Sequence, residues 1–208
     1  MILLPPSQRW LLGLLLAELV LAQLYPPFPA LAQLQHGPTL AVLLAAPWLL
    51  RRWPLSTRSV ASLAGFLALH TLAGRYIYSY VPYDAWTMAL TGHPLSASFG
   101  WRRNHFDRLV HLCFGLLVSG PVAEILRRHM RVPPRLADYV AVEFVLAFSC
   151  LYEIFEWLLT VVLAGSDADA YNGQQGDLWD AQKDMAIAAL GACMATIVRI
   201  GRTRWRRN

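Results

Sequence analysis

The sequence has 208 residues, of which 56% are hydrophobic and only 15% are charged, against roughly 25% charged residues in an average soluble domain. This composition excludes an ordinary soluble domain and predicts a single integral membrane domain over residues 1–208. The net charge of +5 comes almost wholly from arginines in short runs between apolar segments. That pattern is typical of membrane topology signals and argues against nucleic-acid binding.

Six apolar segments follow one another along the chain, and most approach the roughly 20 residues that a membrane-spanning helix needs. They lie at about residues 10–24, 31–50, 59–80, 105–126, 138–163 and 181–200. The second is the weakest, because Gln33, Gln35, His36 and Pro38 interrupt its start. We therefore predict an all-α, polytopic membrane helix bundle of about six transmembrane helices. The first segment is expected to remain uncleaved, because prolines separate it from the nearest small-residue cleavage site.

The arginines predict how such a bundle would be oriented. With six spans, Arg9, the arginines at 51–58, those at 127–135 and the tail from 199 to 207 all fall on one side of the membrane. The positive-inside rule then places both termini in the cytoplasm. Membrane lipids are the expected partners, and the sequence does not indicate an oligomeric state.

The same topology brings the polar residues of four helices to one depth, near the periplasmic face. Asp177, Asp180 and Asp184 are spaced three and then four apart, so a helix would place them on one face. Charged side chains at such positions are costly and are usually paired or functional. The predicted polar cluster comprises His70, Arg75, Asn104, His105, Asp107, Arg108, His111, Glu153, Glu156, Asp177, Asp180 and Asp184.

Two interpretations of this cluster remain open. Carboxylates and imidazoles at helical spacing on facing helices can hold a metal, and one divalent ion or bound protons would fit the surplus of acidic residues. The candidate metal ligands are Asp107, His111, Glu153, Glu156, Asp180 and Asp184. Alternatively, the acidic residues face Arg75, Arg103 and Arg108 in an ion-pair network that only fixes helix packing.

Five sequence blocks resemble the YjdF-like family of bacterial inner-membrane proteins. They are "HTLAGRYIYSYVP", "RNHFDRLVHLCFG", "AEILRR", "YEIFEW" and "GQQGDLWDAQKDMAIAALGA", within roughly residues 60–195. The chain departs from the family pattern at Gln174, where threonine is expected, and at Lys183, where an aromatic residue is expected. The resemblance implies a multi-pass inner-membrane protein. The family has no established activity, so the resemblance supplies no catalytic residues.

Three functions are compatible with this pattern. In a metal-dependent membrane hydrolase or transferase, the cluster would hold the metal, and Arg75 and Arg108 would hold the anionic headgroup of a lipid-like substrate. In a proton- or ion-coupled carrier, the same carboxylates would load and release a cation. In a membrane scaffold, the cluster would be a structural ion-pair network. No phosphate-binding loop, nucleophile elbow or HExxH motif is present.

Overall fold

The computed structural model describes residues 4–162 and 173–205, with side chains up to residue 202. Within these ranges the chain forms helices and no strands, as predicted. Six long helices follow one another along the described chain, and two short helices lie between the third and the fourth. The helices are α1 (Pro6–Ala22), α2 (Pro29–Arg52), α3 (Thr57–Arg75), α4 (Tyr83–Thr91), α5 (Leu95–Phe99), α6 (Phe106–His129), α7 (Pro134–Val162) and α9 (Asp180–Trp205).

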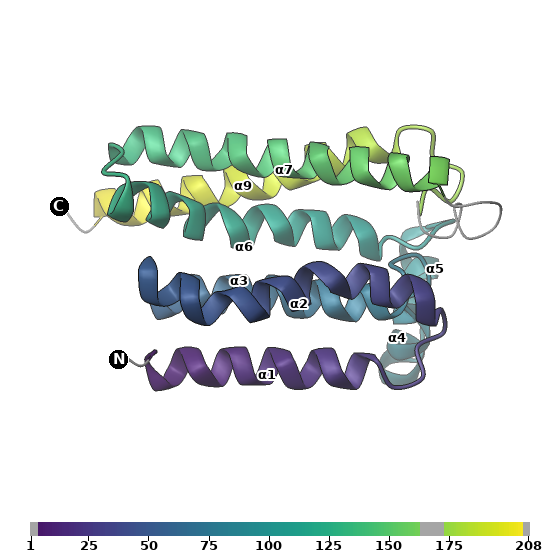
Figure 1. The fold of residues 1–208 in the computed structure, drawn as a ribbon. Coiled ribbons are helices and arrows are strands. Elements are labelled where there is room, and N and C mark those ends of the chain that lie inside the picture. The colour runs from purple at the N-terminus through teal and green to yellow at the C-terminus, as the bar shows by residue number, and fades with distance from the viewer. Residues whose placement is uncertain (1–3, 163–172, 206–208) are drawn as a thin grey trace.

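The six long helices lie side by side along one axis (Figure 1). Helix α3 contacts α1, α2 and α6, and α6 in turn packs against α7 and α9. The short helices α4 and α5 lie at one end of this bundle, and both chain termini lie at the other. We call the end where α6 and α9 begin the acidic end, and the end where both helices finish the arginine end.

The helix boundaries agree with the apolar segments, with one correction. The third segment, expected to reach residue 80, ends as a helix at Arg75, because Ile77 and Tyr78 adopt left-handed φ angles of 44° and 59°. The interrupted start of the second segment is helical, and α2 continues through Pro38. His36 therefore lies on a buried helix face and not in a loop.

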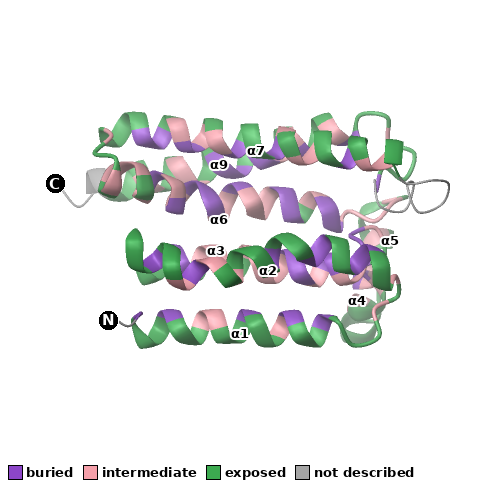
Figure 2. Cartoon of the chain, in the orientation of Figure 1, coloured by how far each residue is buried: buried purple, intermediate pink, exposed green. Residues whose placement is uncertain are grey.

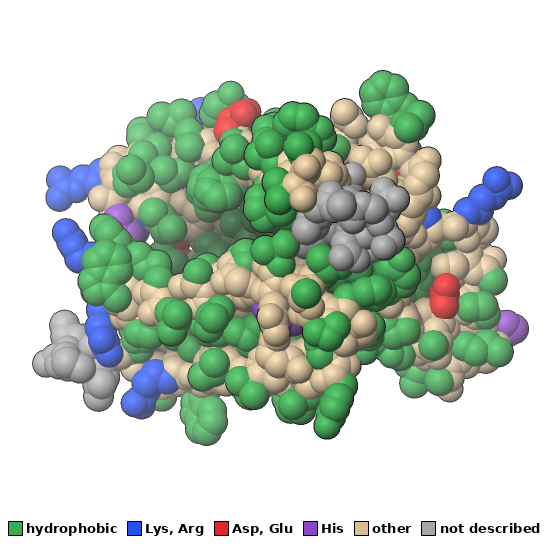
Figure 3. Space-filling view, turned by 45° about the vertical axis from the view of Figure 1, so that its right-hand side comes forward, with side chains coloured by type: hydrophobic (Ala, Val, Ile, Leu, Met, Phe, Trp, Pro, Cys, Tyr) green, Lys and Arg blue, Asp and Glu red, His purple; other side chains and the backbone are tan. Residues whose placement is uncertain are grey.

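Three helices, α6, α7 and α9, are long and apolar enough to cross a membrane. The prediction of six spans is thus met in part, because α1 has only 17 residues and the first turns of α2 are polar. Large apolar side chains on the outer face of α7 are solvent-exposed, among them Trp157 at 61% and Val161 at 69%. Exposed residues cover the outward faces of the helices (Figure 2), and hydrophobic side chains cover much of the surface (Figure 3), as lipid contact would require.

Glycines allow α6 and α9 to cross at very short range. A methyl group on Gly115 would lie 2.0 Å from the carbonyl oxygen of Ala188, and one on Gly191 would lie 2.3 Å from that of Leu112. Ala188 and Ala192 are completely buried in this crossing. Small residues let helix backbones approach closely in membranes, where apolar burial does not drive helix association. The crossing fixes the positions of the polar residues nearer the acidic end.

Candidate polar site at the acidic end

The polar residues of α6 and α9 continue the stripes that form the crossing. Asp107, His111 and Gly115 follow one another at four-residue intervals on α6, and Asp184 precedes Ala188 by the same interval on α9. Residues four apart share a helix face, so both stripes face the partner helix. The buried face of α7 carries Ser149 and Glu156 toward the same region. Three helices thus deliver acidic groups to one place, and these groups divide into two layers.

The first layer lies at the start of α9, and we call it the outer ion-pair layer: Arg103, Arg108, Asp177, Asp180 and Lys183. The Arg108 Nη2 atom lies 2.8 Å from Asp177 Oδ2 and 2.7 Å from Asp180 Oδ1. Arg103 donates to both carboxylate oxygens of Asp180. Lys183 Nζ completes the layer, at 2.8 and 2.7 Å from the two oxygens of Asp177. Each of the two acidic residues in this layer is therefore paired with at least two cations, and Arg108 is shared between them.

The electrostatics of the layer follow from these contacts. The hydrogen bond from Lys183, then that from the Trp179 backbone amide, lowers the pKa of Asp177 to about 2. Asp180 is only 4% exposed, and its neutralisation by two guanidinium groups offsets the cost of that burial. Arg103 also donates to the carbonyl oxygens of Gly173 and Gln174, so it ties the segment before α9 to the start of α6.

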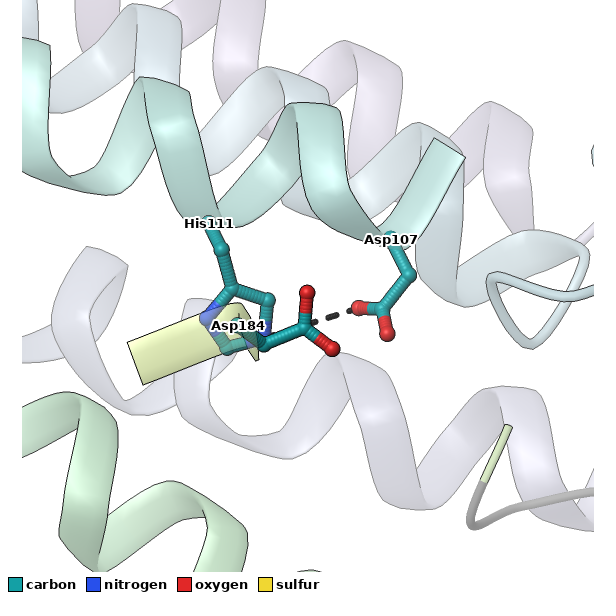
Figure 4. Close-up of side chains that lie close together, drawn as sticks. All are labelled: Asp107, His111 and Asp184. Atoms are coloured by element: carbon teal, nitrogen blue, oxygen red, sulfur yellow. Dashed lines mark ion pairs between the residues drawn. The ribbon is translucent and has the colours of Figure 1, made fainter. Parts of the chain in front are cut away.

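The second layer lies one helical turn deeper, and we call it the deep acidic cluster: Asp107, His111, Glu153, Glu156 and Asp184. One ligand atom from each of Asp107, His111 and Asp184 can be chosen so that all three lie within 4.8 Å of one another. The three side chains converge from two helices (Figure 4). The Nε2 atom of His111 lies 3.6 Å from Asp107 Oδ1 and 3.4 Å from Glu153 Oε1.

No arginine or lysine of the described residues forms an ion pair with the deep acidic cluster, whose ion-pair contacts there are those to His111. Asp184 is 1% exposed, and its Oδ1 atom has no hydrogen-bond partner among the described residues. The same is true of Glu153 Oε1, since its contact with His111 lacks hydrogen-bond geometry. Buried carboxylates this close repel one another unless protons or a cation offset their charge.

His111 is oriented by a residue that the sequence analysis did not identify. Its Nδ1 atom lies 3.3 Å from the Ser149 hydroxyl of α7, while Nε2 faces the carboxylates. Metal-binding histidines are commonly held in this way, with one ring nitrogen on a hydrogen-bond partner and the other on the metal. A signal for Ser149 does exist in the sequence, because it lies four residues before Glu153 on the same stripe of α7.

Four residues of the predicted cluster lie outside both layers. His70 contacts the Tyr78 hydroxyl and the Gln35 carbonyl oxygen. Arg75 donates to carbonyl oxygens at the end of α1, with Nη1 2.9 Å from Ala22 O. The remaining two, Asn104 and His105, lie just before α6.

Those two residues organise the loop that leads into α6. Asn104 accepts a hydrogen bond from the Phe106 amide and donates to the Val81 carbonyl oxygen. His105 contacts the Trp101 ring, with 4.6 Å between ring centroids. Burial, and then the positive charge of the nearby arginines, lowers the pKa of His105, so it does not add a cation at neutral pH.

A further polar contact lies at the opposite, arginine end. Asp138 is buried, and its Oδ1 atom accepts from Arg199 Nε at 3.2 Å. Arg199 also donates to the hydroxyls of Ser119 and Thr196. The sequence analysis treated Arg199 as part of a topology signal. Its partner is 61 residues away, and no spacing rule links the two.

Comparison with known proteins supports the assignment that the residues suggested. A family model described as "Predicted membrane protein (DUF2238)" matches residues 7–204. Inner membrane protein YjdF of Escherichia coli (strain K12) is 33% identical over 153 residues, which make up 73% of this chain and 68% of that protein. No solved structure matches the chain significantly. The resemblance to YjdF-like proteins is thereby confirmed, and the chain belongs to the DUF2238 family of predicted membrane proteins.

Proposed function

We propose that this protein binds one divalent metal ion in the deep acidic cluster, as a six-span inner-membrane protein with both termini in the cytoplasm. The single observation that carries the proposal is the pair of buried carboxylate oxygens, Asp184 Oδ1 and Glu153 Oε1, that have no hydrogen-bond partner among the described residues. A buried charge without a partner is strongly destabilising, so such a cluster needs a cation or protons.

The donor set fits a metal ion. Asp107, His111 and Asp184 offer two carboxylates and one imidazole, a mixture that suits zinc and manganese. Glu153 lies beside the same His111 nitrogen and would be a fourth ligand or a base that accepts a proton from water. Asp180 is excluded from the proposed ligands, because Arg103 and Arg108 engage its oxygens.

A bound divalent ion would supply Lewis-acid catalysis, so the activity we propose is metal-dependent hydrolysis or group transfer on a lipid-like substrate. The chain's own residues would hold the ion and accept the proton of the attacking group. Arg75 is not assigned the role of holding an anionic headgroup, because its guanidinium group caps the carbonyl oxygens of α1.

Metal analysis of protein purified without chelator tests this proposal. We expect about one equivalent of metal, and a rise in thermal midpoint when zinc or manganese is added to metal-depleted protein. Asp107→Asn and Asp184→Asn should lose both effects. Asp177→Asn is the matched control, since it removes a carboxylate from the outer ion-pair layer and should retain the metal. Metal well below one equivalent, with no thermal shift, would overturn the proposal.

A proton- or ion-coupled carrier is the second candidate, and Glu156 favours it. This residue is 8% exposed and faces Glu153 and the Tyr152 hydroxyl, so it adds a carboxyl beyond those nearest to His111. Surplus carboxyls inside a bundle are typical of proton relays. Reconstituted vesicles should then show pH-dependent cation flux that Glu153→Gln abolishes. Glu143→Gln, an exposed change on the same helix, is the control.

A further inference from the structure

A cavity of about 760 Å³ lies at the arginine end, far from both acidic layers, and we call it the arginine groove. Its floor is the second half of α6, from Leu116 to Arg128. The start of α3 and the last turns of α9 form its two walls. The volume of this groove falls within the range of roughly 300–1,000 Å³ that is typical of small-molecule binding sites.

The lining is strongly basic. Five arginines line the groove against one carboxylate, that of Glu124; they are Arg58, Arg127, Arg128, Arg199 and Arg202. Glu124 is already engaged, because it accepts from the Ser56 amide and hydroxyl, at 2.7 Å each, and from the Ser59 hydroxyl. Its contact with Arg128 is a longer one, at 3.4 Å.

Three of these arginines have no acidic partner. Arg199 is neutralised by Asp138, but Arg58, Arg127 and Arg202 form no ion pair with any carboxylate in the described part of the chain. The three come from three different helices, α3, α6 and α9, and all line the same cavity. Guanidinium groups that line one cavity and lack carboxylate partners favour the binding of an anion, most often a phosphate.

The rest of the lining is apolar and lies toward the middle of the bundle. Leu116 and Leu117 of α6 and Met194 and Val198 of α9 lie nearer the bundle centre than the arginines do. The lining of the groove therefore changes from charged at the arginine end to apolar toward the bundle centre. An inorganic anion would use only the charged part, whereas an amphiphile with an anionic headgroup would use both.

We propose that the arginine groove binds an anionic phospholipid of the surrounding bilayer. The lipid phosphate would contact Arg58, Arg127 and Arg202, and the start of an acyl chain would lie against Leu117 and Val198. Basic pockets between membrane helices bind anionic headgroups by the same combination of charge and apolar contact. This site is separate from the proposed metal site and does not depend on it.

Binding of lipids to purified, full-length protein in mild detergent tests the proposal, with native mass spectrometry and thermal midpoint as readouts. Phosphatidylglycerol should bind and stabilise, and phosphatidylcholine should bind at least tenfold more weakly. The triple variant Arg58→Gln, Arg127→Gln, Arg202→Gln should lose this preference. The control triple variant Arg51→Gln, Arg131→Gln, Arg135→Gln removes the same charge from exposed positions outside the groove and should keep it.

A second variant separates chain contact from simple charge attraction. A Cβ atom added at Gly120, on the floor, would meet only Arg199 Nη1 within 4 Å, at 3.7 Å, so the first side-chain atom of Gly120→Leu has space and the rest of the side chain would extend into the groove. It should weaken phosphatidylglycerol binding without lowering the thermal midpoint of the lipid-free protein, because leucine is the better helix former. The proposal would be overturned if the control triple variant lost the preference for phosphatidylglycerol as fully as the groove variant does. It would also be overturned if inorganic phosphate stabilised the protein as strongly as the lipid.

Discussion

The outer ion-pair layer and the deep acidic cluster both contain aspartates at the start of α9, Asp180 and Asp184, one turn apart, yet their charges are balanced differently. Asp180 accepts from two arginines, whereas Asp184, four residues later, has a buried oxygen with no hydrogen-bond partner among the described residues. The two aspartates differ because the arginine side chains of the described chain reach Asp180 and form no ion pair with Asp184. The ion pairs that Arg103 and Arg108 form with carboxylates in the described part of the chain are all with Asp177 and Asp180, at the start of α9. An acidic stripe on a helix can therefore be structural at one turn and available to a ligand at the next.

Arg108 shows how the division arises on α6. It adjoins Asp107 in sequence, but successive helix residues point about 100° apart, so the two side chains face different partners. Arg108 reaches the aspartates at the start of α9, and Asp107 faces His111 and Asp184. Four substitutions test the two layers, and we expect their effects on stability to decrease from Gly115→Leu to Asp177→Asn.

The largest effect should come from Gly115→Leu, which would remove the basis of both layers at once. Its first side-chain atom would lie 2.0 Å from the Ala188 carbonyl oxygen, and backbone cannot move aside as a flexible side chain can. Overpacking typically costs about 1–3 kcal/mol, and we expect this change to exceed that range. Gly13→Leu is the control, because an added Cβ there meets nothing within 4 Å. Thermal unfolding in detergent measures both; equal stability of the two variants would contradict the close crossing.

Asp180→Asn should be the most harmful single change within the outer ion-pair layer. It leaves Arg103 and Arg108 facing a neutral amide in a site where the Asp180 side chain is only 5% exposed. Breaking one partner of a buried pair typically costs about 3–5 kcal/mol. A double-mutant cycle with Arg103→Gln measures the coupling between the two residues. A coupling energy near zero would show that the layer does not stabilise the fold.

The chemically identical change one turn deeper, Asp184→Asn, should behave in the opposite way. Without added metal it removes repulsion between Asp107 and Asp184, so the thermal midpoint should stay the same or rise. With metal at about 100 times its dissociation constant, the native protein should gain about 2.7 kcal/mol, and the variant should gain little. If Asp184→Asn destabilised metal-free protein as much as Asp180→Asn, the two layers would not differ in kind.

The sequence predicted the helices well, because apolar periodicity and length are local properties. It also predicted that the acidic residues of α6, α7 and α9 lie toward the same end of the bundle, since that end follows from position along each helix. It did not predict which carboxylates meet arginines. Arg75 illustrates the reason: its side chain caps the end of α1, a contact set by how α1 and α3 pack and not by any spacing within α3. The metal ligands themselves remain a prediction.

Short connecting elements were the least predictable part of the fold. Helices α4 and α5 were not expected, because each is too short to show a clear apolar period. Ser149 could have been found by extending the α7 stripe one turn back from Glu153. Asp138 could not be paired with Arg199, because the two meet only after α7 and α9 pack together.

The smallest effect concerns Asp177, the most accessible acidic group of the outer ion-pair layer, at 18% side-chain exposure against 5% for Asp180. Its folded-state pKa of about 2 lies below the roughly 3.9 of an unfolded aspartate. Its ion pairs therefore stabilise the fold fully above about pH 4, and that contribution is lost as the pH falls toward 2. The difference in thermal midpoint between native protein and Asp177→Asn should thus be constant near neutral pH, shrink as the pH falls through about 2, and vanish only below that pH. The carboxyl groups of the deep acidic cluster titrate in both proteins, so their effect cancels in this difference.

Lys183→Gln is the control. It removes the main cause of the lowered Asp177 pKa, so the stabilisation by Asp177 should be lost at a higher pH. A difference that stays constant down to pH 2 would show that Asp177 contributes no charge to the outer ion-pair layer.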